Sequence, residues 1–261
     1  MPIRRKTPNR FALLIIQLLF IIPAFGQIYP PDGLRMPGSW NNWVNDPEMG
    51  GPFDLLKVNT GTPRWTTTFQ YTGNQSFDAF KFVSTSFGNP WGNQWAGNVS
   101  MSVNSLQPLT YGTPSDPDNN ISLVQNRWYT VVFEDSGYAN TRVIFMEIST
   151  EPAGIAGVMQ NPVVVSSTDM VEVSASLSAM PSPEEYFYLR YTTDDWATSS
   201  LITMNISGSS LTGNIPAQPS QTEVTYYIFS TVAENPAADF DLLTLQMANN
   251  NGQNYSYTVD Q

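Results

Sequence analysis

The sequence contains neither cysteine nor histidine. Without cysteine the chain has no disulfides and no thiolate nucleophile, and without histidine it lacks the side chain that most often acts as a base near neutral pH. Zinc sites built on these residues and triads with an imidazole base are therefore excluded. The fold has to be held by core burial instead, and a hydrophobic fraction of 41% in 261 residues is sufficient for two modest cores.

Basic residues are scarce, and four of the eleven lie within the first ten positions. An apolar run over 11–22 follows them, interrupted only by Gln17 and shorter than the roughly 20 residues of a membrane-spanning helix. Residues 23–26 (Pro-Ala-Phe-Gly) then supply a helix breaker and small residues typical of a cleavage site. The pattern predicts a signal peptide over 1–26, with an uncleaved N-terminal anchor as the alternative.

Loss of this segment removes four basic and no acidic residues, which leaves 7 basic against 22 acidic residues and a net charge of −15. Such a surface repels both phosphate backbones and anionic lipid headgroups. We therefore expect no nucleic-acid partner, and no segment after residue 26 has the length and apolar character of a spanning helix.

Short runs of alternating apolar and polar residues predict an all-β chain. The expected strands lie at 65–71, 79–83, 128–133, 142–148, 170–177, 186–191, 201–206 and 224–230. Six of the seven tryptophans precede Arg142, and the Pro- and Gly-containing stretch after residue 150 has no strand pattern. The sequence predicts two β-sandwich domains in tandem after the signal peptide, over 27–150 and 161–261, with a linker at 151–160.

Four tryptophans in the first predicted domain lie in two segments rich in asparagine and glycine. Trp40 and Trp43 flank two asparagines, whereas Trp91 and Trp95 fall in an expected loop over 87–98. Between these segments, the strand at 79–83 directs Lys81 away from the face that its neighbouring phenylalanines bury. A pyranose ring stacks its apolar face on an exposed indole, and its hydroxyls need amide and ammonium partners. Two indoles set at an angle would fit a curved α-1,4-glucan.

The order of residues 38–43 (Gly-Ser-Trp-Asn-Asn-Trp), 80–82 (Phe-Lys-Phe), Trp91 and Asn98 resembles starch- and glycogen-binding modules, including those of bacterial outer-membrane starch-utilisation proteins. The resemblance implies a β-sandwich with an α-glucan site. It implies that Trp43, Lys81, Trp91 and Asn98 form this site, with Trp95 as a competing match for the second tryptophan.

The second predicted domain resembles bacterial immunoglobulin-like or fibronectin type III-like modules. Residues 188–196 are similar to a central strand and turn of such modules, and 213–230 to a strand, a corner and the following strand. The resemblance implies a spacer or a stabilising neighbour for a binding domain.

Catalysis has little support in the sequence. Glycosidases need two carboxylates on one cleft, but Glu134 and Asp135, like Glu184 and Glu185, are adjacent and would face opposite sides of a strand. Residues 116–120 offer oxygen ligands without the spacing of a calcium-binding loop. We therefore expect no enzymatic activity, no metal and no cofactor.

The leading hypothesis is an exported protein that binds an α-glucan or another polysaccharide. It would be secreted by a Gram-negative bacterium or held on its outer-membrane surface, in preference to the periplasm. The alternative is a structural or protein-interaction component of the cell surface, such as an adhesin, a filament or a secretion-system accessory, whose partners would be cell-surface proteins. A third interpretation makes the chain a piece of a larger secreted protein.

Overall fold

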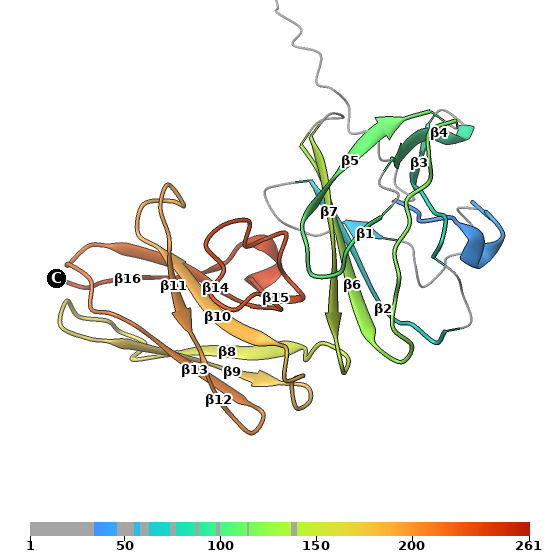
Figure 1. Ribbon diagram of the computed structural model, residues 1–261. Coiled ribbons are helices and arrows are strands. Elements are labelled where there is room, and N and C mark those ends of the chain that lie inside the picture. The colour runs from blue at the N-terminus through green and yellow to red at the C-terminus, as the bar shows by residue number, and fades with distance from the viewer. Residues whose placement is uncertain are drawn as a thin grey trace, which may run out of the picture.

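A computed structural model describes residues 34–45, 55–57, 63–73, 77–86, 89–97, 100–113, 115–136 and 140–261. The predicted signal peptide lies outside these residues. The regular secondary structure of the described chain consists of antiparallel strands and two 3₁₀ turns, η1 (Ser39–Asn41) and η2 (Asn250–Gly252), which confirms the all-β prediction. Figure 1 shows the strands gathered into two bodies that follow one another along the chain. No helix in the described part is long and apolar enough to cross a membrane.

The first domain contains one seven-stranded sheet in the order β1-β2-β6-β7-β5-β4-β3. Its central strands are rich in Thr, Val and aromatic residues, which suit a pleated and partly buried surface. The strands are β1 (Leu56–Lys57), β2 (Arg64–Gln70), β3 (Phe82–Ser86), β4 (Asn89–Ala96), β5 (Gln107–Gly112), β6 (Trp128–Asp135) and β7 (Thr141–Ile148).

This sheet folds over on itself to enclose the first core. Phe82 of β3 and Trp95 of β4 each lie with their ring centroids 5.2 Å from that of Phe133 on β6, although β6 is three or four strands away in the sheet order. The segment before β1 bridges the two sheet edges, since Leu34 pairs with Leu55 and Arg35 pairs with Val83. The first core is therefore rich in aromatic side chains, and the folded sheet encloses it from two sides.

The second domain is a sandwich of two sheets around a separate core. One sheet has the order β11-β10-β14-β15, with β16 also paired to β14, and the other has the order β12-β13-β9-β8. The strands are β8 (Ile155–Asn161), β9 (Val171–Leu177), β10 (Tyr186–Thr192), β11 (Ser200–Thr203), β12 (Asn205–Ser207), β13 (Ser210–Ile215), β14 (Glu223–Thr231), β15 (Gln246–Ala248) and β16 (Tyr255–Thr258).

The linker predicted at 151–160 is wrong over most of its length, because Ile155–Asn161 is strand β8. A register shift interrupts the pairing of β8 with β9 between Ala156 and Met159. Gly157 lies inside this shift with φ 61°, a conformation that disfavours residues with a side chain. The bulge breaks the alternation that would have marked the strand in the sequence, and only residues 149–154 separate β7 from β8.

The two domains share an apolar interface. Val132 on β6 and Ile144 on β7 turn away from the first core and pack in a cluster with Leu242 and Leu245, which come from the segment between β14 and β15. Leu242 is 1% exposed. Both faces of β6 and β7 are therefore buried, one within the first domain and one against the second.

Ion pairs surround this apolar cluster. Nη2 of Arg127 lies 2.8 Å from a carboxylate oxygen of Glu184, and Nη1 of Arg142 lies 2.8 Å from Asp239. Glu184 also accepts hydrogen bonds from Ser182 and Ser149. These bonds, that of Ser182 first, lower the pKa of Glu184 to about 2. The interface between the domains therefore has an apolar centre with ion pairs at its periphery.

Candidate functional site

A strained turn presents the first tryptophan of the site. After η1, Asn42 and Trp43 have φ values of 54° and 62°, in the left-handed region that residues other than glycine seldom adopt. The amide of Trp43 donates to the carbonyl of Gly38 (2.9 Å), and Nδ2 of Asn41 donates to the carbonyl of Val44 (2.8 Å). The turn is therefore fixed by its own hydrogen bonds, which offset the cost of its backbone.

Gly38 anchors this turn to the segment before β3. A Cβ added at this position would lie 2.5 Å from the carbonyl oxygen of Ala79 and 2.6 Å from Cβ of Phe80, so only glycine permits the close approach. The two tryptophans of the turn then separate. Trp40 stacks on Phe77 at 6.1 Å between ring centroids and 14° between planes, at the edge of the core. The ring of Trp43 stays half-exposed.

A β-bulge determines where the second pair of tryptophans lies. The pairing of β3 with β4 shifts between Ser84, which faces Asn93, and Ser86, which faces Asn89. Strand β4 thus advances four residues while β3 advances two. Regular alternation would place Trp91 and Trp95 on one face, but the bulge turns Trp91 away from the core, and Trp95 stays in it at 0% exposure.

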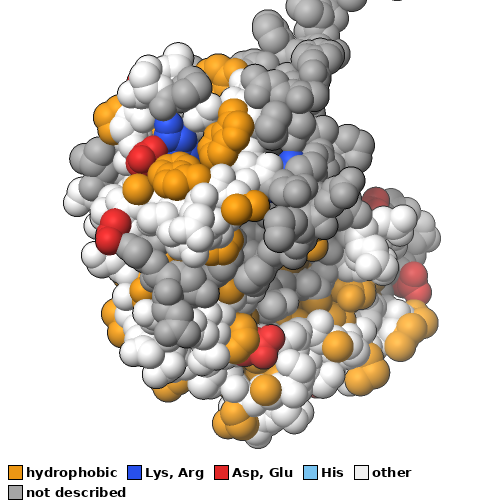
Figure 2. All heavy atoms as spheres, turned by 90° about the vertical axis from the view of Figure 1, so that its right-hand side faces the viewer, with side chains coloured by type: hydrophobic (Ala, Val, Ile, Leu, Met, Phe, Trp, Pro, Cys, Tyr) orange, Lys and Arg blue, Asp and Glu red, His pale blue; other side chains and the backbone are white. Residues whose placement is uncertain are grey.

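Trp91 and Trp43 lie next to each other in the lining of an open hollow of about 500 Å³. Their ring centroids are 6.3 Å apart and their planes are inclined by 43°. Lys81, Gln94 and Asp118 complete the described lining of this hollow. Figure 2 views the face of the molecule on which this hollow opens, and it shows a basic and an acidic side chain next to hydrophobic groups. The hollow therefore combines two angled indoles with three polar side chains.

Lys81 directly precedes β3, and Gln94 lies on the adjacent strand β4. Gln94 pairs with Val83, so it shares with Lys81 the outer face of the sheet. The Lys81 side chain is 5% exposed, and its Nζ lies 3.5 Å from Oδ1 of Asp118. Nε2 of Gln94 donates to the carbonyl of Trp91 (2.9 Å), which holds the bulged backbone in place. The polar groups are thus fixed before any ligand arrives.

Three of the five site residues predicted from the sequence, Trp43, Lys81 and Trp91, come together in this hollow. Asn98 lies outside the described residues. Trp95 is not available for stacking, because it is fully buried and its ring packs against Tyr111 and Phe133. The segment 87–98, which was predicted to be a loop, is largely strand β4, and Trp95 is buried because this strand directs its ring into the core.

Gln94 and Asp118 were not predicted. For Gln94 a signal was present, since a strand over 89–96 would have placed it on the face opposite Trp95. Asp118 lies in a turn whose neighbour Pro117 accepts a hydrogen bond from the amide of Gly97, so only the tertiary structure brings it to Lys81. No protein-family model matches the chain, and no curated protein shows significant sequence similarity to it.

Proposed function

We propose that the chain is an exported, non-catalytic carbohydrate-binding protein that binds α-glucans at the hollow lined by Trp43 and Trp91. The observation that carries this proposal is the pair of half-exposed indoles at 6.3 Å and 43°. Two aromatic planes inclined in this way match successive glucose units of a curved chain better than a flat polymer surface. The resemblance of residues 38–43 and 80–82 to starch-binding modules favours the same ligand.

Binding would combine ring stacking with a small number of hydrogen bonds. Each indole covers the apolar face of one glucose unit, while the ammonium of Lys81 donates to hydroxyl oxygens and the amide of Gln94 lies beside them. An open hollow buries little of a long ligand, so the affinity for a short oligosaccharide is modest. A polymer offers many overlapping binding positions, and retention on it is correspondingly stronger.

The arrangement of carboxylates supports binding without catalysis. Glycoside hydrolysis generally uses two carboxyl groups across the scissile bond, about 5 to 10 Å apart. Asp118 is the single carboxylate among the described residues that line the hollow, and Lys81 occupies one of its oxygens. Within its described lining, the hollow therefore offers a stacking platform without a second carboxylate.

Affinity electrophoresis in gels containing amylopectin tests the proposal. We expect the protein to be retarded, and the double variant Trp43→Ala, Trp91→Ala to migrate as in a gel without glucan. Leu56→Ala is the matched control, since it removes a 72% exposed apolar side chain from the same domain and should leave retardation unchanged. Absence of retardation in the wild type, or equal retardation of the double variant, would overturn the proposal. Circular dichroism confirms that each variant is folded.

Exposed apolar side chains on the second domain favour a second candidate function, that of a protein-interaction component of the cell surface. Val163 and Val164 are 80% and 70% exposed, and Met159 on the edge strand β8 is 67% exposed. An exposed edge strand with apolar neighbours is a template for pairing with another chain. A stoichiometric protein partner lost in a Val163→Ser, Val164→Ser variant, combined with no retention by glucan, would support this function over the first.

A further inference from the structure

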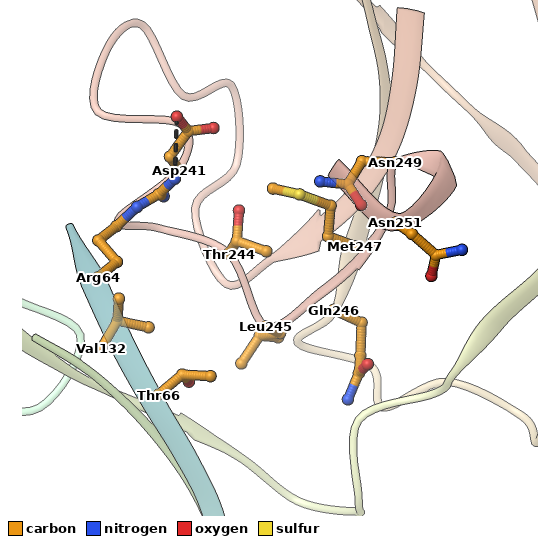
Figure 3. A pocket seen from close by; sticks show the side chains of 10 residues that line it. All are labelled: Arg64, Thr66, Val132, Asp241, Thr244, Leu245, Gln246, Met247, Asn249 and Asn251. Atoms are coloured by element: carbon orange, nitrogen blue, oxygen red, sulfur yellow. Dashed lines mark ion pairs between the residues drawn. The ribbon is translucent and has the colours of Figure 1, made fainter. Parts of the chain in front are cut away.

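The interface between the domains contains a second cavity, separate from the hollow at Trp43. It has a volume of about 310 Å³, and Figure 3 shows the side chains that surround it. Arg64 and Thr66 of β2 and Val132 of β6 form one wall, and the segment that leads into β15 and η2 forms the other. The second wall consists of Asp241, Thr244, Leu245, Gln246, Met247, Asn249 and Asn251.

Arg64 has unused hydrogen-bonding capacity in this cavity. It is 1% exposed, and its Nε donates no hydrogen bond to any part of the chain that the structure describes. Nη2 lies 3.1 Å from Oδ2 of Asp241 as an ion pair. Burial lowers the pKa of the Arg64 guanidinium to about 10, against the opposing effect of Glu134. Leaving a donor of a buried cation unsatisfied is costly, so the cavity favours an occupant that supplies an acceptor.

The charges around the cavity select a neutral occupant. Asp241 stands beside Arg64, and its Oδ1 accepts a hydrogen bond from the hydroxyl of Tyr227 at 3.0 Å. Nη1 of Arg190 lies 3.9 Å from the same oxygen. A bound anion would be repelled by Asp241, and a bound cation would be repelled by the two arginines. A hydroxyl group fits both partners, because it accepts from the guanidinium and donates to the carboxylate.

The remaining wall suits a ring that carries several hydroxyls. Gln246 and Asn251 contribute amides, and Leu245 and Met247 contribute apolar surface against which a ring face can pack. Ligand pockets commonly measure about 300 to 1,000 Å³, so this cavity suits a ligand of one or two rings and not a polymer. A neighbouring hollow of about 150 Å³ shares Asp241, Met247 and Asn249 with the cavity and is also lined by Trp196, which extends the polar and aromatic surface.

We propose that this interdomain cavity is a second carbohydrate site, which binds a neutral mono- or disaccharide whose adjacent hydroxyls bridge Arg64 and Asp241. The site is made by both domains and lies apart from the Trp43–Trp91 hollow. Failure of glucan binding at the hollow therefore leaves this proposal intact, and the converse also holds.

Side-chain NMR of Arg64 tests the proposal in the full chain carrying Trp43→Ala and Trp91→Ala, which removes the first site. The Nε–H signal of the buried guanidinium is followed during titration with glucose, galactose, arabinose and maltose. We expect a saturable shift with at least one of these sugars. Gln246→Ala should weaken that binding roughly five- to tenfold, the effect of one lost hydrogen bond to a bound ligand.

Three outcomes would overturn the proposal. The first is the absence of a saturable shift with all four sugars. The second is a shift with sodium acetate and none with the sugars, which would identify an anion site. The third is an equal shift with glycerol, which would show that the cavity takes up any small polyol. Asp241→Asn preserves the side-chain shape, and loss of the shift in this folded variant provides a second line of support.

Discussion

Leu242→Ala is expected to destabilise the first domain from a position in the second. Leu242 is 1% exposed and packs in the interdomain cluster with Val132, Ile144 and Met146. Truncating a buried leucine to alanine costs about 2 to 5 kcal/mol, through lost burial and the cavity that remains. We expect a loss of about 3 kcal/mol, because the β6 and β7 side of the cluster belongs to a rigid sheet that cannot collapse onto the vacated space.

Urea unfolding followed by tryptophan fluorescence measures this effect. Six of the seven tryptophans precede Arg142, so the signal reports mainly on the first domain. With a slope of about 2 to 3 kcal/mol per molar urea, a loss of about 3 kcal/mol lowers the midpoint by about 1 M. The fluorescence transition should therefore shift although the substitution lies 94 residues after the end of β7.

The control is Met180→Ala, which removes a 68% exposed side chain of the second domain and should change the free energy of unfolding by less than about 0.5 kcal/mol. If the fluorescence midpoint of Leu242→Ala matches that of the control, the two domains unfold independently and the reasoning about a shared interface is refuted.

Three further predictions concern single residues. Gly38→Ala should lower the melting temperature in differential scanning calorimetry, because the new Cβ would lie 2.5 Å from the carbonyl oxygen of Ala79; an unchanged value would contradict this close approach. Glu184→Gln should destabilise the protein most above pH 4.5, and its difference from the wild type should vanish as the pH falls through about 2, because the carboxylate whose pKa is depressed in the folded state loses its advantage on protonation. Parallel urea titrations across this range measure the difference, and a pH-independent difference would exclude the charged network. Trp95→Phe should cost about 1 to 3 kcal/mol in stability and leave retardation by amylopectin intact, since the ring lies in the core; selective loss of retardation in the folded variant would return Trp95 to the site.

Regular strands were predictable because each buries one face or both. The expected strands at 128–133 and 142–148 correspond to β6 and β7, and those at 186–191 and 224–230 correspond to β10 and β14. In these segments, β-branched and aromatic residues follow one another in nearly continuous runs, as expected for strands that are buried on both faces. The all-β fold followed from this pattern, because it depends on residues that pack and not on those that bind.

Breaks in the pattern were less predictable. The expected strand at 201–206 is two strands, since β11 belongs to one sheet and β12 to the other, with buried Met204 at the crossing. Strand β8 was mistaken for a linker because its bulge at Gly157 interrupts the alternation. Where the chain passes from one sheet to the other or forms a bulge, the local sequence still resembles an ordinary strand or turn. The structure at such a position depends on the strand with which it pairs, which the local sequence does not reveal.

The candidate site depends on such irregular features. Trp43 reaches the hollow through a left-handed turn, and Trp91 reaches it through the bulge in β4. Each departure from regular backbone frees an indole that regular packing would have buried, as it buried Trp95. The left-handed turn and the β-bulge both cost stability, and neither improves the packing of the core. Their presence at one hollow therefore favours a role in ligand binding. Residue pattern thus locates the core, whereas the candidate binding surface becomes visible only where the pattern is broken.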